Sequence, residues 1–224
     1  MPNTNLKLTG ASYQSAKYAC LNWHYSKCIP IGKLVKIGVY ENSKFIGVVI
    51  FGRGACGHLG HFVGLGQTEV CELARIALNK HETPVSKIVA ISLKILKKLN
   101  PKMKLVVSYS DSNQGHYGGI YQAGNWVYVG QGGKEKFYMI NGKLTHPRNL
   151  SSTAFDLDNK RELRYKGLTV LQRAKLDDPF AYEVKMKGKF KYLMAIDKQV
   201  KNDILKFAKP YPKRVKQAMN DDQS

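Results

Sequence analysis

The chain has 224 residues, 43% of them hydrophobic, and a formal net charge of +20 at pH 7. This length and apolar fraction suffice for a globular core. The charge is larger than an ordinary metabolic enzyme needs and is typical of a protein that docks on a phosphate backbone, so nucleic acid is the expected partner. We expect a cytoplasmic protein with no membrane contact, because no stretch resembles a spanning helix or a signal peptide.

Charge and cysteine placement suggest how the chain is organised. Asp111 is the only aspartate in the first 150 residues, so it is a candidate for a specific role, although a helix cap would also explain it. The sequence becomes more charged beyond Pro147, which predicts a catalytic domain over 1–150 and a basic C-terminal extension over 151–224 that packs on it and contacts DNA. The four cysteines have neither CxxC nor zinc-ribbon spacing and are expected to be incidental thiols.

The first predicted elements are a helix and a hairpin. Residues 13–26 carry apolar side chains at helical spacing after Ser12, a plausible cap. Residues 35–54 alternate on both sides of a turn at 41–43, which predicts a β-hairpin. The glycine-rich stretch 52–69 lacks the lysine and Ser/Thr of a phosphate-binding P-loop and is expected to be a mobile flap or a DNA-facing loop.

A strand, a helix and a second strand follow. Residues 69–79 predict a strand, and 81–100 predict a helix with Thr83 as N-cap, Pro84 at the first helical position and a stop at Asn100 and Pro101. Residues 104–110 predict a short buried strand. A parallel strand pair flanked by hairpins indicates a mixed-sheet α/β (α+β) fold, with ligands near the strand ends where the strand order switches.

The remaining elements are shorter. Residues 125–130 and 134–140 are predicted to pair as a hairpin across a Gly-rich turn. Residues 187–196 predict a strand, 197–209 a short helix, and 210–224 a loose tail.

The order of these elements resembles the acetyltransferase-like fold of the GNAT superfamily. In that superfamily a central strand bulges, and the next helix N-terminus binds the pyrophosphate of acetyl-CoA through backbone amides. The corresponding segment, "CELARIALNKHETPVSKIVA", lacks the glycine-rich phosphate loop. The resemblance therefore allows acetyl-CoA as a cofactor, with these predicted contacts: Ala74, Arg75, Ile76, Thr83, Val85, Ser86 and Lys87.

Five motifs in a fixed order resemble one family more closely. They are "HYS" at 24–26, "FIGVVIFGRGA", "CELARIAL", "SYSDSNQGHYGGIYQAGNWVYVG" and "PYPKR". Together they are similar to the bacteriophage Mom family of DNA modification proteins. The resemblance implies a transferase-like enzyme of the host cytoplasm that converts adenine N6 in duplex DNA to a carbamoylmethyl (acetamido) adenine and so protects phage DNA from restriction. It leaves the oligomeric state open, a homodimer being one option.

The same resemblance implies an iron-dependent site. It assigns His24, Tyr25, Asp111 and Tyr121 to an iron (Fe2+) and catalytic cluster, to which we add Ser108 as a catalytic residue. An imidazole nitrogen with carboxylate and phenolate oxygens suits an iron centre. Asp111 and Tyr121 could instead act as base and acid. A single histidine is more often a satisfied polar residue than a ligand, and Tyr121 could simply pack.

Other residues compete for or add to this site. His58 and His61 are a rival metal pair, although a glycine-rich loop gives their spacing no fixed geometry. His116 could reach the same site or the target base. Because the target amine lies inside the duplex, the adenine is expected to flip out and to stack on Tyr117, Tyr121 or Trp126. Gly115, Gly118 and Gly119 weaken a helix, which predicts a surface that a base or cofactor approaches closely.

Basic residues supply the expected DNA contacts. Alternating lysines from 185 to 191 suggest one strand face that tracks phosphates, or an edge strand protected from aggregation. Two other functions stay open: an N-acetyltransferase acting on a protein or small amine, and a non-enzymatic basic DNA-binding protein. The predicted DNA-binding residues are Lys33, Lys36, Arg53, Lys134, Lys136, Arg148, Lys187 and Lys189.

Overall fold

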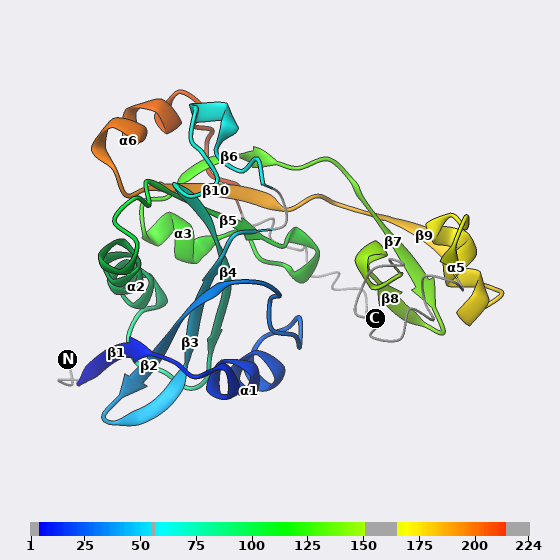
Figure 1. Ribbon diagram of the computed structural model, residues 1–224, viewed down its shortest axis with the longest axis horizontal. Helices are drawn as coiled ribbons and strands as arrows, with labels where there is room; N and C mark the ends of the chain where they lie inside the picture. Colours follow the sequence, from blue (N-terminus) through cyan, green and yellow to red (C-terminus); the bar gives the residue numbers. More distant parts are fainter. Residues whose placement is uncertain (1–4, 55–56, 151–164, 214–224) are drawn as a thin grey trace, which may run out of the picture. The chain divides into compact units, whose positions relative to one another are not determined.

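The computed structural model describes residues 5–54, 57–150 and 165–213 (Figure 1). The chain forms two compact units, one made of residues up to Gln131 together with those from Phe190 onward, and one made of Gly132–Lys189. The second unit is thus inserted between two strands of the first. The division differs from the predicted boundary after residue 150. The DNA contact of residues 151–224 stays a prediction, and 151–164 and 214–224 lie outside the described residues.

The first unit is built on a seven-stranded sheet. Its central neighbours β4 and β5 are parallel, and every other neighbouring pair is antiparallel. The predicted mixed α/β sheet is therefore confirmed, as is the hairpin of β2 and β3. In spatial order the strands are β1 (Leu6–Gly10), β2 (Leu34–Glu41), β3 (Lys44–Gly52), β4 (Val70–Leu78), β5 (Leu105–Ser110), β10 (Phe190–Ala195) and β6 (Val127–Gln131).

Helices cover both faces of this sheet. Strand residues alternate between the faces, so Val49 packs in one core with α2 (Val85–Leu99) and α3 (Gly119–Ala123), whereas Val48 packs in another with α1 (Tyr13–Trp23). On that second face, α6 (Lys198–Leu205) buries Val200 and Ile204 against the strands. The parallel pair is thus enclosed, as buried strands require.

The helix ends follow the predicted signals in part. Ser12 caps α1 by accepting a 3.0 Å bond from the Ser15 amide, as predicted. The predicted end of α2 at Asn100 is also confirmed. Thr83 is not the N-cap of α2, because the helix begins at Val85 and Pro84 stands at the cap position.

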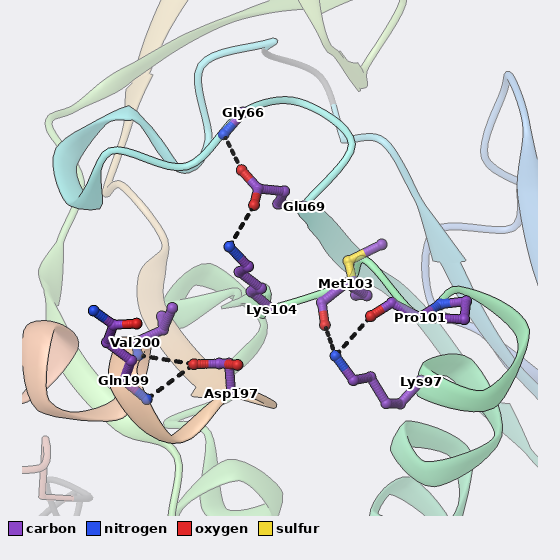
Figure 2. Close-up of polar contacts among 9 residues, drawn as sticks. All are labelled: Gly66, Glu69, Lys97, Pro101, Met103, Lys104, Asp197, Gln199 and Val200. Atoms are coloured by element: carbon purple, nitrogen blue, oxygen red, sulfur yellow. Dashed lines mark hydrogen bonds and ion pairs between the residues drawn. The ribbon is translucent and has the colours of Figure 1, made fainter.

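Polar contacts fix the loops beside α6 (Figure 2). Glu69 accepts bonds from the Gly66 amide at 2.9 Å and the Lys104 ammonium at 2.7 Å. Asp197 caps α6 by accepting bonds from the Gln199 and Val200 amides. In the glycine-rich stretch, which contains η1 (His61–Val63), Leu59 and Leu65 are buried. This part therefore packs on the sheet, unlike the predicted flap.

The second unit is a three-stranded antiparallel sheet with a helix. Strands β8 (Lys143–Thr145), β7 (Glu135–Ile140) and β9 (Tyr182–Met186) are neighbours in that order, and α5 (Val170–Asp177) packs on them with η3 (Pro147–Leu150). The predicted hairpin of residues 125–140 is wrong, because β6 pairs with β10 and β7 pairs with β8 and β9. Period-two alternation identifies a strand but not its partner.

The lysines from 185 to 191 do not share one strand face. β9 ends at Met186 and β10 begins at Phe190. Lys187 and Lys189 thus lie between two strands that belong to different sheets. The prediction of a single lysine-bearing strand is wrong.

Candidate active site

The two parallel strands separate partway along their length. β4 and β5 pair only from Val70 and Leu105 to Leu73 and Ser108. The register with β3 shifts at this point and leaves Ala74 as the extra residue of a bulge, which bends β4 away. Beyond it, β4 follows β3 and β5 follows β10. This is the bulged central strand that the resemblance predicts.

A buried hydroxyl pair lies where the strands separate. Ser108 donates a 2.9 Å bond to the Leu73 carbonyl, and its Oγ lies 2.8 Å from the hydroxyl of Tyr121 on α3. Since a serine has one proton, Tyr121 donates to Ser108. Burial raises the pKa of Tyr121 to about 12. Tyr121 is therefore a neutral hydrogen-bond donor near pH 7.

His24 ends α1 and is held by its neighbour. Its Nδ1 accepts a 3.1 Å bond from the Ser26 amide and lies 2.8 Å from the Ser26 hydroxyl. Burial, followed by the charge of Arg75, lowers the pKa of His24 to about 4. The ring is therefore neutral at pH 7. Because Nδ1 accepts the amide proton, the ring proton lies on Nε2, which is then a donor.

Tyr25 and His116 place two rings beside His24. The ring centroids of Tyr25 and His24 are 4.4 Å apart, and those of Tyr25 and His116 are 5.5 Å apart at 74°. Tyr25 is 48% exposed. Burial and the Asp111 carboxylate raise its pKa. His116 thus lies at the same site, and Tyr25 is an aromatic ring that a ligand can reach.

Asp111 follows the last residue of β5. Its Oδ1 accepts bonds from the Asn113 amide at 3.0 Å and from Asn113 Nδ2 at 3.1 Å, which caps the 3-10 turn η2 (Ser112–Gln114). Its charge also acts on the pKa of Tyr25. Asp111 thus both caps η2 and lies at the site. Its Oδ2 is the oxygen that a substrate can use.

Arg75 is the functional side chain that the sequence did not reveal. It follows the bulge, donates from Nη1 to the Ala74 carbonyl at 2.7 Å, and lies with Nη2 3.5 Å from the Cys28 sulfur. Its charge opposes protonation of His24. Arg75 was predicted as a contact of acetyl-CoA and not as a neighbour of His24. A charged residue inside the apolar run "CELARIAL" was the available signal for this role.

The predicted iron ligands do not form a ligand set as arranged. Among the residues that the structure describes, no three His, Cys, Asp or Glu side chains come close enough to hold a metal ion. Tyr121 is hydrogen-bonded to Ser108. His58 and His61 do face each other, with ring nitrogens 3.2 Å apart. Iron binding stays a prediction, and no chemical step is assigned to it.

The start of α2 already holds a carboxylate. Buried Glu41 accepts bonds from the Thr83 amide at 2.7 Å and the Glu82 amide at 3.0 Å. A pyrophosphate would meet this negative charge at the predicted cradle. The segment therefore does not fit the pyrophosphate at Thr83, and acetyl-CoA enters no step below.

Several predicted ligand contacts are packed inside the protein. Trp126 and Tyr121 are buried against each other at 5.1 Å, and Tyr117 packs on Phe190. A Cβ at Gly118, where φ is +75°, would overlap the Tyr192 ring. The glycine therefore allows the backbone to pack against Tyr192 and does not make room for a ligand. The prediction that these rings and this glycine meet a base is not supported by their packing.

The predicted DNA-binding residues are divided between the two units. In the first, Lys33 and Arg53 are exposed and Lys36 is half-buried. In the second, Lys134 and Lys187 are exposed, Lys136 pairs with Glu183 at 3.0 Å, and Lys189 with Glu135 at 3.7 Å. The side chain of Arg148 lies outside the described part. DNA contact by these residues stays a prediction.

Fold and site together define a class of protein: a mixed α/β protein whose parallel strands separate beside His24, Asp111 and Tyr121. The profile of the Mom protein family matches residues 5–213, and the chain belongs to that family.

Individual similarities are more distant. "Methylcarbamoylase mom" of Escherichia phage Mu is 27% identical over 127 residues, which are 55% of this chain and 52% of that protein. A putative acetyltransferase from Acinetobacter baylyi ADP1 has a TM-score of 0.44 at 8% identity, covering 88% of this chain and 95% of its own. A probable acetyltransferase from Staphylococcus epidermidis ATCC 12228 also has a TM-score of 0.44, at 9% sequence identity. The match covers 87% of this chain and 99% of the acetyltransferase. Within the described residues, no helix is long and apolar enough to cross a membrane.

Proposed function

We propose that the protein modifies phage DNA by attaching a carbamoylmethyl group to adenine N6. The supporting observation is that the motif residues His24, Asp111 and Tyr121, distant in sequence, meet where β4 and β5 separate in a member of the Mom family. The net charge of +20 suits a DNA substrate.

Different residues of the chain accept and donate the protons of the proposed reaction. Forming the new bond joins N6 to the methylene carbon of the added group and breaks the bond from that carbon to its leaving group, which keeps the bonding electron pair. N6 releases one proton. Asp111 Oδ2 is the acceptor for that proton, because Oδ1 is engaged by Asn113. His24 Nε2 is the donor, suited to the atom that leaves with the donor, and the Tyr121 hydroxyl, whose proton is engaged by Ser108, holds β5 in place beside it.

Access requires the adenine to leave the duplex, because its amine is inside the stack. Tyr25 is the exposed ring beside Asp111 and His24, so it replaces the buried Tyr121 and Trp126 as the surface for the flipped base. Burial, together with the charge of Arg75, lowers the pKa of His24 and keeps that imidazole neutral, which preserves Nε2 as a donor without an added positive charge.

The test is mass spectrometry of nucleosides from cells that express the protein. Wild type should produce a carbamoylmethyl adenine, and Asp111→Asn should not; Tyr18→Phe, an exposed tyrosine on α1, is the control and should match wild type. Unmodified adenine together with acetylated protein would instead establish the N-acetyltransferase. Unmodified adenine with DNA bound in wild type would establish the DNA-binding protein.

A further inference from the structure

A groove of about 480 Å³ opens on the sheet face that α6 covers. Figure 1 shows α6 next to the cyan segment that contains η1, above β6 and β10. We call this feature the α6 groove. It is lined by Phe62, Val129, Lys191, Lys206, Phe207, Ala208 and Lys209.

Two phenylalanines form its aromatic wall. The rings of Phe62 and Phe207 meet edge to face, with centroids 5.3 Å apart at 83°. They remain 37% and 43% exposed. The ammonium of Lys191 lies 4.7 Å above the Phe62 ring, a cation–π contact that holds it at the groove. Phe207, at 43% exposed, is a ring that a ligand can reach.

Three lysines supply the charge. Lys191 comes from β10, Lys206 is the C-cap of α6, and Lys209 lies in the segment that follows α6. The Lys209 amide donates a 2.8 Å bond to the Tyr128 carbonyl, which fixes this segment against β6. Lys206 pairs with Asp203 at an exposed site, where an ion pair contributes little and is easily exchanged for a phosphate. Among the described residues that line the groove, none is acidic.

The groove lies near the active site. Lys191 is the register partner of Tyr109, and Asp111 follows Tyr109 by two residues. Strand geometry therefore puts the backbone of Lys191 on the order of 10 Å from the backbone of Asp111. This distance corresponds to a few nucleotides of one DNA strand.

We propose that the α6 groove binds DNA beside the target adenine, with phosphodiester groups on its lysines and one unpaired base on Phe207. Aromatic rings beside ammonium groups are the usual platform for unpaired nucleotides. Flipping of the adenine leaves such a base behind. The inference rests on the proposed DNA substrate and adds a second contact outside the chemistry.

The test is binding of a fluorescent duplex with one central mismatch, measured by anisotropy between 50 and 200 mM KCl. Phe207→Ala should weaken binding about tenfold, and Phe207→Tyr should retain it. Lys206→Ala and Lys209→Ala should each reduce the salt slope by about one. Lys98→Ala, an exposed lysine on α2, is the matched control and should match wild type. Circular dichroism confirms that each variant is folded.

The outcomes distinguish failure of the groove assignment from failure of the proposed function. If wild type binds the duplex and Phe207→Ala and the groove lysine variants bind it equally well with the same salt slope, the groove assignment is wrong and the proposed function stands. If wild type binds no DNA, both fall. Tighter binding of wild type to RNA of the same sequence would also overturn the groove's assignment to DNA.

Discussion

The hydroxyl of Tyr121 donates to Ser108 across 2.8 Å, at the last residue pair that joins β4 to β5. Ser108 in turn donates a hydrogen bond to the Leu73 carbonyl of the neighbouring strand. Tyr121 of α3 is thereby linked through Ser108 to both strands just before they separate. This chain of bonds fixes the position of the Tyr121 hydroxyl relative to the opening.

Tyr121→Phe should separate chemistry from stability. The ring keeps its packing on Trp126 and Tyr192, so the loss of one hydrogen bond should cost about 1 kcal/mol in urea unfolding. Modification of DNA should decrease by nucleoside mass spectrometry while the protein stays folded, because the hydroxyl no longer holds Ser108 beside the opening. Ser108→Ala, which leaves the Tyr121 hydroxyl unpaired, should cost about 1–3 kcal/mol. Full activity of a folded Tyr121→Phe would reduce Tyr121 to a packing role.

Local signals predicted the elements, and motifs predicted which residues meet. Ser12 and Asn100 marked helix ends, and His24, Asp111 and Tyr121 do share one region. The sequence could not show that β6 pairs with β10, because a residue pattern defines a strand's faces and not its neighbour.

Some roles depended on contacts that no local pattern records. Glu41 looked like part of a hairpin turn, whereas its carboxylate binds amides 41 and 42 residues further along the chain. Arg75 and Cys28 meet only because α1 covers the bulged strand, so neither the pattern of the strand nor that of the helix could bring them together.

Adjacent glycines in the motif should respond oppositely to alanine. Gly118→Ala puts a Cβ into the Tyr192 ring at a φ of +75°, so it should destabilise the fold by about 2–4 kcal/mol. Gly119 begins α3 with open space around it, and Gly119→Ala should stabilise by up to about 1 kcal/mol. Urea unfolding of both variants measures the difference. Equal effects would show that Gly118 is not packed as described.

The Glu41 carboxylate should compete with anions for the backbone amides of Glu82 and Thr83, just before α2. Burial raises its pKa, but the bonds from Thr83 and Glu82 outweigh this and leave the pKa lowered. Its contribution is therefore present above the unfolded pKa of 4.5 and is lost as the pH falls below it. Glu41→Gln should lose about 1–3 kcal/mol at pH 7 and, by calorimetry, bind acetyl-CoA more tightly than wild type. Tight binding by wild type, unchanged in the variant, would show that the carboxylate does not block the cradle.

Asp111→Asn should preserve the cap and remove the charge. The amide oxygen can still accept the Asn113 bonds, so unfolding should change by less than about 1 kcal/mol. Activity should fall by about two orders of magnitude or more, because the base is lost. The pKa of Tyr25 should decrease, as measured by ultraviolet titration against Tyr25→Phe. Asn113→Ala retains the carboxylate and the backbone cap bond, loses only the bond from Nδ2, and should keep most of the activity. An equal loss in both variants would mean that the contact with the Asn113 side chain, and not the charge of Asp111, controls the activity.

His24 should make the fold sensitive to mild acid. Its pKa is lowered from 6.5 to about 4 in the folded protein. Between these two pH values His24 is protonated in the unfolded chain and neutral in the folded chain. Stability is therefore lost as the pH falls from 6.5 toward 4, by on the order of 2 kcal/mol after allowance for solvent at a half-buried ring. Urea midpoints at pH 7.5 and 5, in buffer with EDTA, should fall less in His24→Gln than in wild type, because glutamine does not titrate and can still accept the Ser26 amide. His61→Gln should follow wild type. The same acid sensitivity in His24→Gln would mean that other groups control it, and that His24 is not held neutral by burial and Arg75.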